Sequence, residues 1–266
     1  MRTIGSIVIG VLAAAAFAAA ATAEAARAET GVLALRAALP WTSVLSRDLT
    51  DCPAGLPGTA LCYARPVRGL VRGLGRVSHT YLYPVDQAPT GCPAGNYRVL
   101  GYTVRFAVAG KGTIDLAVPG SAQCLTIDRV LTPTYPPFSI TAGTGIYESA
   151  SGRGTLTQRA GFTRSGASGT DLWAGTLTVP GLEFDLGAPV LSGAVATTLR
   201  APKGVKTVRA AFKVTARDAV DGALPVSCSR RSGTRFPIGR TTVSCSATDT
   251  SGNVRSARFA VTVRGG

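Results

Sequence analysis

Hydrophobic and polar side chains alternate with a period of two over several short stretches of this chain. The clearest stretch, residues 97–109, has one face made only of apolar side chains: Leu100, Tyr102, Val104, Phe106 and Val108. Its opposite face is mixed, which is typical of a strand in an antiparallel sheet with one buried face. Similar runs predict further strands at residues 76–85, 113–118, 123–130, 138–141, 154–159, 172–179 and 182–186.

Glycine and proline separate these runs, and signals for helices are scarce after Asp51. Gly110-Lys111-Gly112 suits a hairpin turn, because glycine adopts a positive φ without steric cost. A short helix is predicted only at residues 33–39, where Pro40 would end it. Short strands between frequent turns predict an all-β chain that forms barrels or sandwiches.

One basic segment interrupts the alternation. Arg65, Arg68, Arg72 and Arg76 recur every three or four residues, with apolar residues between them. Three interleaved glycines disfavour a stable helix, each by about 1 kcal/mol relative to alanine. We expect a solvated basic segment here, and the alternative is a contact with an anionic surface.

The N-terminus has the pattern of an export signal. Arg2 precedes an unbroken apolar run at residues 7–21, and two Ala-x-Ala cleavage sites end at Ala23 and Ala28. The run falls short of the roughly 20 strongly apolar residues that span a membrane. We therefore predict a signal peptide at residues 1–28, a secreted mature chain without a membrane span, and a short linking segment at residues 29–50.

The cysteine count supports this compartment. Six cysteines lie after the predicted signal peptide, at positions 52, 62, 92, 124, 228 and 245. An even number of cysteines in an exported chain indicates disulfides. We expect Cys228 to pair with Cys245 in the C-terminal part. For the other four we favour Cys52 with Cys62 and Cys92 with Cys124, and an interleaved pairing remains open.

The last third of the chain combines acidic turns with short strands. Its characteristic segments are Asp218-Ala-Val-Asp221-Gly222, Val226-Ser-Cys228, Phe236-Pro237, Cys245-Ser-Ala-Thr-Asp249-Thr-Ser-Gly252-Asn253 and residues 257–263. These segments resemble the HYR (hyalin repeat) family of extracellular immunoglobulin-like modules. The resemblance implies an immunoglobulin-like β-sandwich at residues 199–266, with a role in adhesion or interaction.

A second resemblance concerns the larger part of the chain. The motif consists of Phe138-Ser-Ile140-Thr141, Gly143-Thr144-Gly145, Tyr147 and Ala150-Ser151-Gly152-Arg153-Gly154. It resembles allene-oxide-cyclase-like and dirigent-like β-barrels over about residues 69–186. The resemblance implies an antiparallel barrel of about eight strands at residues 51–198, with Tyr147 over one end. No functional residue of those families matches a position here, so no activity is carried over.

The net charge of +14 is unevenly distributed. Residues 202–266 hold twelve lysines and arginines against three acids. Such a charge favours anionic partners, for example an acidic polysaccharide or a cell surface. Its alternative role is solubility. We expect no nucleic acid partner, because the basic part has few aromatic side chains on which bases could stack.

Residues suited to catalysis are scarce, and we expect no catalytic residue and no cofactor. His79 is the only histidine, and no Gly-x-Ser-x-Gly motif accompanies it. We interpret His79 as an ordinary side chain of the barrel. The candidate carboxylate pairs are Asp115 with Asp128 and Glu183 with Asp185, and we interpret them as surface charges.

The acidic turns of the last third also offer oxygen atoms to calcium. Neither the turn of Asp218, Asp221 and Gly222 nor that of Asp249 and Asn253 has the spacing of an EF-hand loop. Aspartate and asparagine in turns accept hydrogen bonds from nearby backbone, and glycine there takes a positive φ. We therefore interpret both segments as structural turns and predict no metal site.

These observations predict a secreted, non-enzymatic adhesion or interaction protein whose basic HYR-like module contacts an anionic surface. One alternative is a barrel that binds a small apolar molecule, with cyclase-like or dirigent-like activity. Another is that the module is a passive spacer. An open apolar lumen in the barrel would favour small-molecule binding, whereas a barrel filled by side chains would favour a function at the surface.

Overall fold

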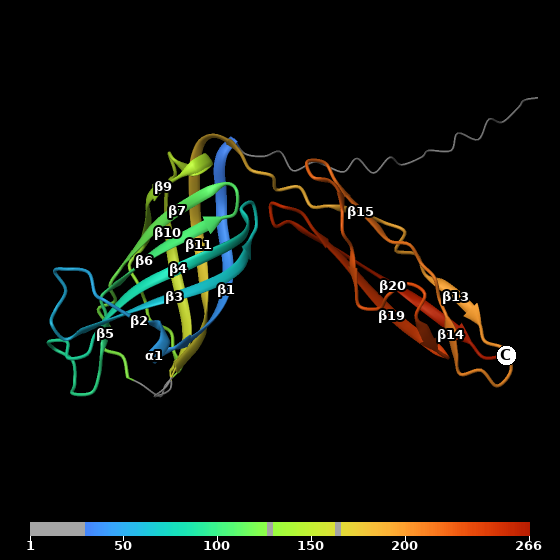
Figure 1. Cartoon of the computed structure of the whole chain (residues 1–266), viewed down its shortest axis with the longest axis horizontal. Helices are drawn as coiled ribbons and strands as arrows, with labels where there is room; N and C mark the ends of the chain where they lie inside the picture. The colour runs from blue at the N-terminus through green and yellow to red at the C-terminus, as the bar shows by residue number, and fades with distance from the viewer. Residues whose placement is uncertain (1–29, 127–129, 163–165) are drawn as a thin grey trace, which may run out of the picture.

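The structure, a computed structural model, describes residues 30–266 apart from 127–129 and 163–165 (Figure 1). The predicted signal peptide and Asp128 lie outside the described residues. The described part is dominated by strands, and its only helices are α1 (Leu45–Asp48) and the 3-10 helix η1 (Gly145–Tyr147). The predicted all-β class is therefore confirmed.

One antiparallel sheet forms the larger part of the molecule. Within this sheet, hydrogen-bonded strands follow one another in the order β1-β11-β10-β9-β7-β6-β4-β3-β2. Eight of its strands are longer than two residues: β1 (Thr30–Val44), β3 (Ala60–Val71), β4 (Gly75–Asp86), β6 (Gly101–Val108), β7 (Gly112–Pro119), β9 (Phe138–Gly143), β10 (Ser151–Phe162) and β11 (Gly166–Glu183). Three short strands complete it: β2 (Leu49–Thr50), β5 (Arg98–Val99) and β8 (Val130–Leu131).

The sheet curls until β1 lies beside β3 (Figure 1). No ladder of backbone hydrogen bonds joins these two strands in the described part of the chain, so side chains alone close this seam. Leu39 and Leu33 of β1 lie over Gly69 of β3 and over Gly73, which follows it, and a Cβ added at either glycine would overlap the leucine. The glycines thus let the two edges approach closely.

The helix predicted at residues 33–39 is wrong, because these residues belong to β1. Inward-facing Leu33, Leu35, Leu39 and Trp41 alternate with exposed residues along the strand. Pro40 is tolerated because β1 is an edge strand. The predicted linking segment, residues 29–50, therefore contributes one of the longest strands of the sheet.

The basic segment at residues 65–76 also differs from the expected solvated segment, because Arg65 is buried. It forms the second half of β3, a tight turn and the start of β4. In a strand successive side chains point to opposite faces, so Arg65 is buried whereas Arg68 is exposed, and the arginines do not form one face.

The strand predicted at 182–186 is wrong beyond Glu183, and of the run at 123–130 the described part shows only Val130 in a strand. The other predicted strands are confirmed.

Aromatic side chains fill the space that the sheet encloses. Trp173, Tyr81, Tyr147, Phe106 and Phe138 are the largest fully buried side chains there. Tyr147 reaches this core from η1, where Gly145 has a positive φ of 63°. The inward faces of a half-buried antiparallel sheet thus meet in one continuous core.

The C-terminal module consists of three smaller sheets. Their orders are β12-β15-β16, β13-β20-β19-β17 and β14-β18. The strands are β12 (Val190–Ser192), β13 (Thr197–Arg200), β14 (Thr207–Arg209), β15 (Thr215–Asp218), β16 (Gly222–Leu224), β17 (Ser227–Cys228), β18 (Arg235–Pro237), β19 (Gly239–Thr248) and β20 (Val254–Arg264). Phe236, Val243 and Val261 lie in its core. Because β12 pairs with β15, the module's sheets begin before the expected boundary at residue 199.

Three disulfides join Cys52 to Cys62, Cys92 to Cys124 and Cys228 to Cys245. These are the pairs favoured from the sequence. The third bridge links β17 to β19 directly across the ladder of the module. It closes a loop with a sequence separation of 17, which the chain-entropy account associates with about 3 kcal/mol of stabilisation.

The two parts meet where the turn between β3 and β4 touches the turn between β19 and β20. Gly73 donates its N–H to the Ser251 carbonyl at 2.7 Å, and Arg72 Nε donates to Asn253 Oδ1 at 3.0 Å. Gly75, with φ of 96°, lies so close to Thr250 that an added Cβ would overlap the Thr250 carbonyl oxygen.

Replacing Gly75 with alanine is predicted to loosen this junction. The matched control is Gly91→Ala, which has a similar φ of 82° but no neighbour within 4 Å of an added Cβ. In both variants alanine must adopt a positive φ, which strains the backbone. Gly75→Ala adds a steric overlap of the size that destabilises cores by about 1–3 kcal/mol. Chemical unfolding and limited proteolysis near residue 186 measure the difference, and equal effects of both changes would contradict the described contact.

Candidate functional site

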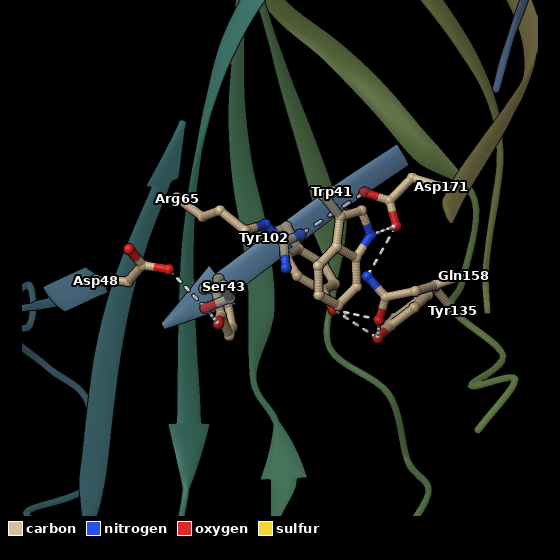
Figure 2. A network of polar contacts seen from close by, with 9 residues as sticks. Trp41, Ser43, Asp48, Arg65, Tyr102, Tyr135, Gln158 and Asp171 are labelled. Atoms are coloured by element: carbon tan, nitrogen blue, oxygen red, sulfur yellow. Dashed lines mark hydrogen bonds and ion pairs between the residues drawn. The ribbon is translucent and has the colours of Figure 1, made fainter. Parts of the chain in front are cut away.

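A buried charged pair is the most unusual feature of the interior (Figure 2). Arg65 Nη2 of β3 lies 3.7 Å from Asp171 Oδ2 of β11, and the two side chains are 3% and 0% exposed. Both residues occupy inward positions of strands whose burial alternates, Arg65 with Val67 and Asp171 with Trp173. Charged side chains are rarely buried unless they are paired, so this pair marks a specialised position.

Hydrogen bonds extend the pair into a network (Figure 2). Asp171 Oδ1 accepts from Trp41 Nε1 at 2.8 Å and from Gln158 Nε2 at 2.9 Å. Gln158 Oε1 in turn accepts from the hydroxyls of Tyr102 at 3.1 Å and Tyr135 at 3.2 Å. The network therefore connects β1, β6, β10 and β11.

The guanidinium of Arg65 lies among aromatic rings. Its Cζ is 3.6 Å from the centre of the Trp41 ring, 4.8 Å from that of Tyr81 and 5.2 Å from that of Tyr83. Rings within about 6 Å attract a cation through their quadrupole, and more strongly where water is excluded. Trp41 thus contacts both charges, one through its ring face and the other through its N–H.

This geometry explains how the seam closes. Trp41 of β1 is held between Arg65 of β3 and Asp171 of β11, so side chains connect the two edges that lack a backbone ladder. A buried ion pair adds little net stability over an apolar substitute. Removing one partner is costly, however, because the other charge is left buried without compensation.

His79 of β4 lies beside this network. It is 2% exposed and lies between the rings of Tyr81 at 5.0 Å and Phe106 at 5.2 Å. Burial, followed by the nearby Arg65 charge, lowers the pKa of His79 to about 4. Neither ring nitrogen has a hydrogen-bond partner among the described residues, so His79 has no positioned nucleophile or carboxylate. The geometry fits an interior side chain.

Two described surface depressions reach outer members of the network: one of about 300 Å³ is lined by Trp41 and one of about 280 Å³ by Tyr102. None of the four described depressions is lined by Arg65, His79 or Asp171. The interior is filled by the aromatic core and the polar network. A small-molecule site would need an apolar space with a few convergent polar groups. The described core instead places aromatic and aliphatic side chains in the space that the curled sheet encloses.

The described carboxylates of the two predicted pairs lie in different surroundings. Asp115 forms an exposed bidentate pair with Arg105, with both nitrogen–oxygen distances at 2.7 Å, and Asp128 lies outside the described residues. Glu183 is exposed. Asp185 is instead partly buried at the junction of the two parts, where it joins acids of the module.

The two acidic turns of the module have the hydrogen bonds expected of structural turns. Asp218 Oδ1 accepts from the N–H groups of Val220 and Asp221, and Asp249 Oδ1 accepts from Asn253 N–H. The structure adds an arrangement that the sequence spacing did not predict. Asp185, Asp218, Asp221 and Asp249 each place one carboxylate oxygen within 4.8 Å of the others.

Burial raises the pKa of the Asp185 carboxyl above its ordinary value. The N–H of Gly187, which donates to Asp185 Oδ1, opposes this shift, and the negative charges of Asp249, Asp218 and Asp221 reinforce it.

The module presents positive charge on its surface. All twelve lysines and arginines of residues 202–266 are exposed, and none forms an ion pair within the described residues. Lys213, Arg230 and Arg231 line a depression of about 490 Å³ together with Phe212, Val226 and Ser232. This groove is a candidate site for an anionic ligand.

The comparisons with known proteins concern the same part of the chain. A family model of the HYR domain matches residues 184–263, which confirms the predicted HYR module. No match was found among curated proteins or among solved structures. No helix in the described residues is long and apolar enough to cross a membrane.

Substitutions in the buried pair are predicted to behave as a coupled unit. Asp171→Asn keeps the shape but leaves Arg65 uncompensated, and should destabilise the fold by about 3–5 kcal/mol. The double variant Arg65→Met/Asp171→Asn should cost at least about 1 kcal/mol less than the sum of the single changes. Denaturant unfolding followed by tryptophan fluorescence measures both values.

The exposed pair provides the control for this cycle. Arg105→Met and Asp115→Asn remove a bidentate pair whose arginine side chain is 62% exposed. Exposed pairs contribute about 0–1 kcal/mol, so these changes should be mild. Equal costs at the buried and exposed pairs, or simple additivity at the buried one, would contradict the assigned coupling.

His79 is predicted to make stability depend on pH. Because its pKa in the folded state is about 4, below the ordinary value of 6.5, the folded protein resists protonation. Its contribution is complete above pH 6.5 and is lost as the pH falls toward 4. Between pH 6.5 and 5 the wild type should lose about 1–2 kcal/mol relative to His79→Phe. Unfolding at several pH values tests this, and parallel curves for the two proteins would refute it.

Proposed function

We propose that this chain is an exported, non-enzymatic interaction protein whose HYR module binds an anionic surface, with an acidic polysaccharide as the class of ligand. The HYR match supports an extracellular interaction role, because modules of this family are typically extracellular and adhesive. The three disulfides are consistent with an oxidising compartment.

The separation of charge on the module carries this proposal. Its only three acids, Asp218, Asp221 and Asp249, gather at the end that faces the curled sheet. The twelve cations of residues 202–266 are exposed and have no carboxylate partner among the described residues. A surface with one sign of charge attracts ligands of the opposite sign over several ångströms.

The groove of Lys213, Arg230 and Arg231 supplies the most specific place for such a ligand. The three cations converge on one depression of about 490 Å³. Arg230 is also oriented by its backbone contact, because Nη1 donates to the Arg235 carbonyl at 3.5 Å and Cζ lies 5.6 Å from the Phe236 ring. Guanidinium groups bind carboxylate and sulfate oxygens through paired N–H donors, which suits an acidic sugar chain.

The alternative of a small apolar ligand in the barrel has less support. The described interior is filled by side chains, and the described cavities open on the surface. The likeness to allene-oxide-cyclase-like and dirigent-like barrels stays a prediction from the sequence.

Binding of the full chain to an immobilised acidic polysaccharide such as polygalacturonate tests the proposal. Lys213→Ala/Arg230→Ala/Arg231→Ala should weaken binding at least about tenfold, since it removes charges that converge on one site. The matched control, Arg36→Ala/Arg153→Ala/Arg159→Ala, removes the same charge from exposed positions of the curled sheet and should change affinity little.

Two results would contradict the proposal. Equal losses in the two triple variants would show that binding follows net charge rather than the groove. The absence of wild-type binding at low ionic strength, where surface electrostatics are strongest, would refute anionic recognition itself.

A further inference from the structure

Four aspartates from separate segments converge at the junction of the two parts. Asp185 lies two residues after the end of β11, Asp218 and Asp221 flank the turn between β15 and β16, and Asp249 follows β19. Their nearest carboxylate oxygens all lie within 4.8 Å of one another. Oxygens that share one calcium ion at about 2.4 Å are separated by no more than about this distance.

One of these carboxylates has a buried oxygen that no described protein group satisfies. Asp185 Oδ2 is buried and has no hydrogen-bond donor among the described residues. Asp218 is only 7% exposed, and its Oδ1 accepts from the N–H groups of Val220 and Asp221. A buried carboxylate oxygen without a donor is costly, so a cationic ligand is the missing partner that the chemistry favours.

The lack of cationic partners for the four aspartates in the described part of the chain also favours a bound cation. No lysine or arginine within the described residues forms an ion pair with any of the four aspartates, although the chain carries a net charge of +14. The nearby Arg72 donates to Asn253 Oδ1 and to the Leu186 carbonyl instead. Four negative charges in so small a space repel one another unless a cation joins them.

The remaining contacts hold the carboxylates in place. Asp249 accepts from the N–H and the side-chain amide of Asn253, each at 2.8 Å, and Asp221 accepts from Thr250. Asn253 Nδ2 also donates to the Asp185 carbonyl at 3.0 Å, which ties the segment after β11 to the turn. The oxygens are therefore positioned before any ion arrives.

We propose that Asp185, Asp218, Asp221 and Asp249 form a calcium site that joins the curled sheet to the HYR module. Calcium fits because every ligand is a carboxylate oxygen and the geometry need not be octahedral, whereas magnesium retains most of its water. One ion would bridge the segment after β11 to two turns of the module. This site is independent of the groove proposed to bind polysaccharide.

Calorimetric titration of calcium into the chelator-treated full chain, with thermal unfolding in parallel, tests the site. Calcium should bind and raise the Tm of the wild type. Asp185→Asn should weaken calcium binding at least about tenfold and abolish the Tm shift, because ligand charge sets affinity in such sites. Without calcium the same variant should be at least as stable as the wild type, since it relieves repulsion, so a folding failure cannot mimic the result.

The matched control is Glu183→Gln, which removes an exposed acid two positions away and should preserve the calcium response. Three outcomes would overturn the proposal: no heat or Tm shift in the wild type at calcium concentrations of about 1 mM, the upper range for extracellular modules; equal calcium affinity in Asp185→Asn and the wild type; or equal loss in Glu183→Gln. An equal response to magnesium would overturn the assignment to calcium.

Discussion

The contact of Trp41 with both Arg65 and Asp171 holds the curled sheet together. Everywhere else in the sheet, neighbouring strands share backbone hydrogen bonds, but β1 and β3 share none in the described residues. Side chains must therefore join the two edges. The tryptophan ring stacks on one charge and its N–H binds the other, while leucines of β1 pack over glycines at β3. The interior charges thus have a structural purpose, which the filled core around them supports.

The sequence predicted the parts of this fold that depend on local alternation, and it failed where distant partners decide the structure. The alternation of apolar and polar side chains correctly predicted strands at residues 97–109 and 76–85. Residues 33–39 are rich in leucine and alanine, which suits a helix, and become a strand only because β11 lies alongside. Trp41 and Asp171 are separated by 130 positions, so no local pattern joins them.

Similar reasoning applies to the candidate sites. The acidic turns of the module were recognisable as turns from their spacing, and their backbone hydrogen bonds follow that pattern. Asp185 looked like a surface partner of Glu183, but it joins those turns because the two parts of the chain pack together. The cations of the module were countable in the sequence, whereas the convergence of Lys213 with Arg230 and Arg231 depends on the folded strands.

We assign stability to the interior of the curled sheet, and we propose that recognition takes place on the surface of the module. Hydrogen–deuterium exchange of the full chain, with and without an acidic polysaccharide, tests this division most directly. On binding, we expect slower exchange in the segment around residues 226–232 and unchanged exchange in β3 and β11. Protection confined to β3 and β11 around Arg65 and Asp171, with the module unaffected, would contradict it and place the function inside the barrel.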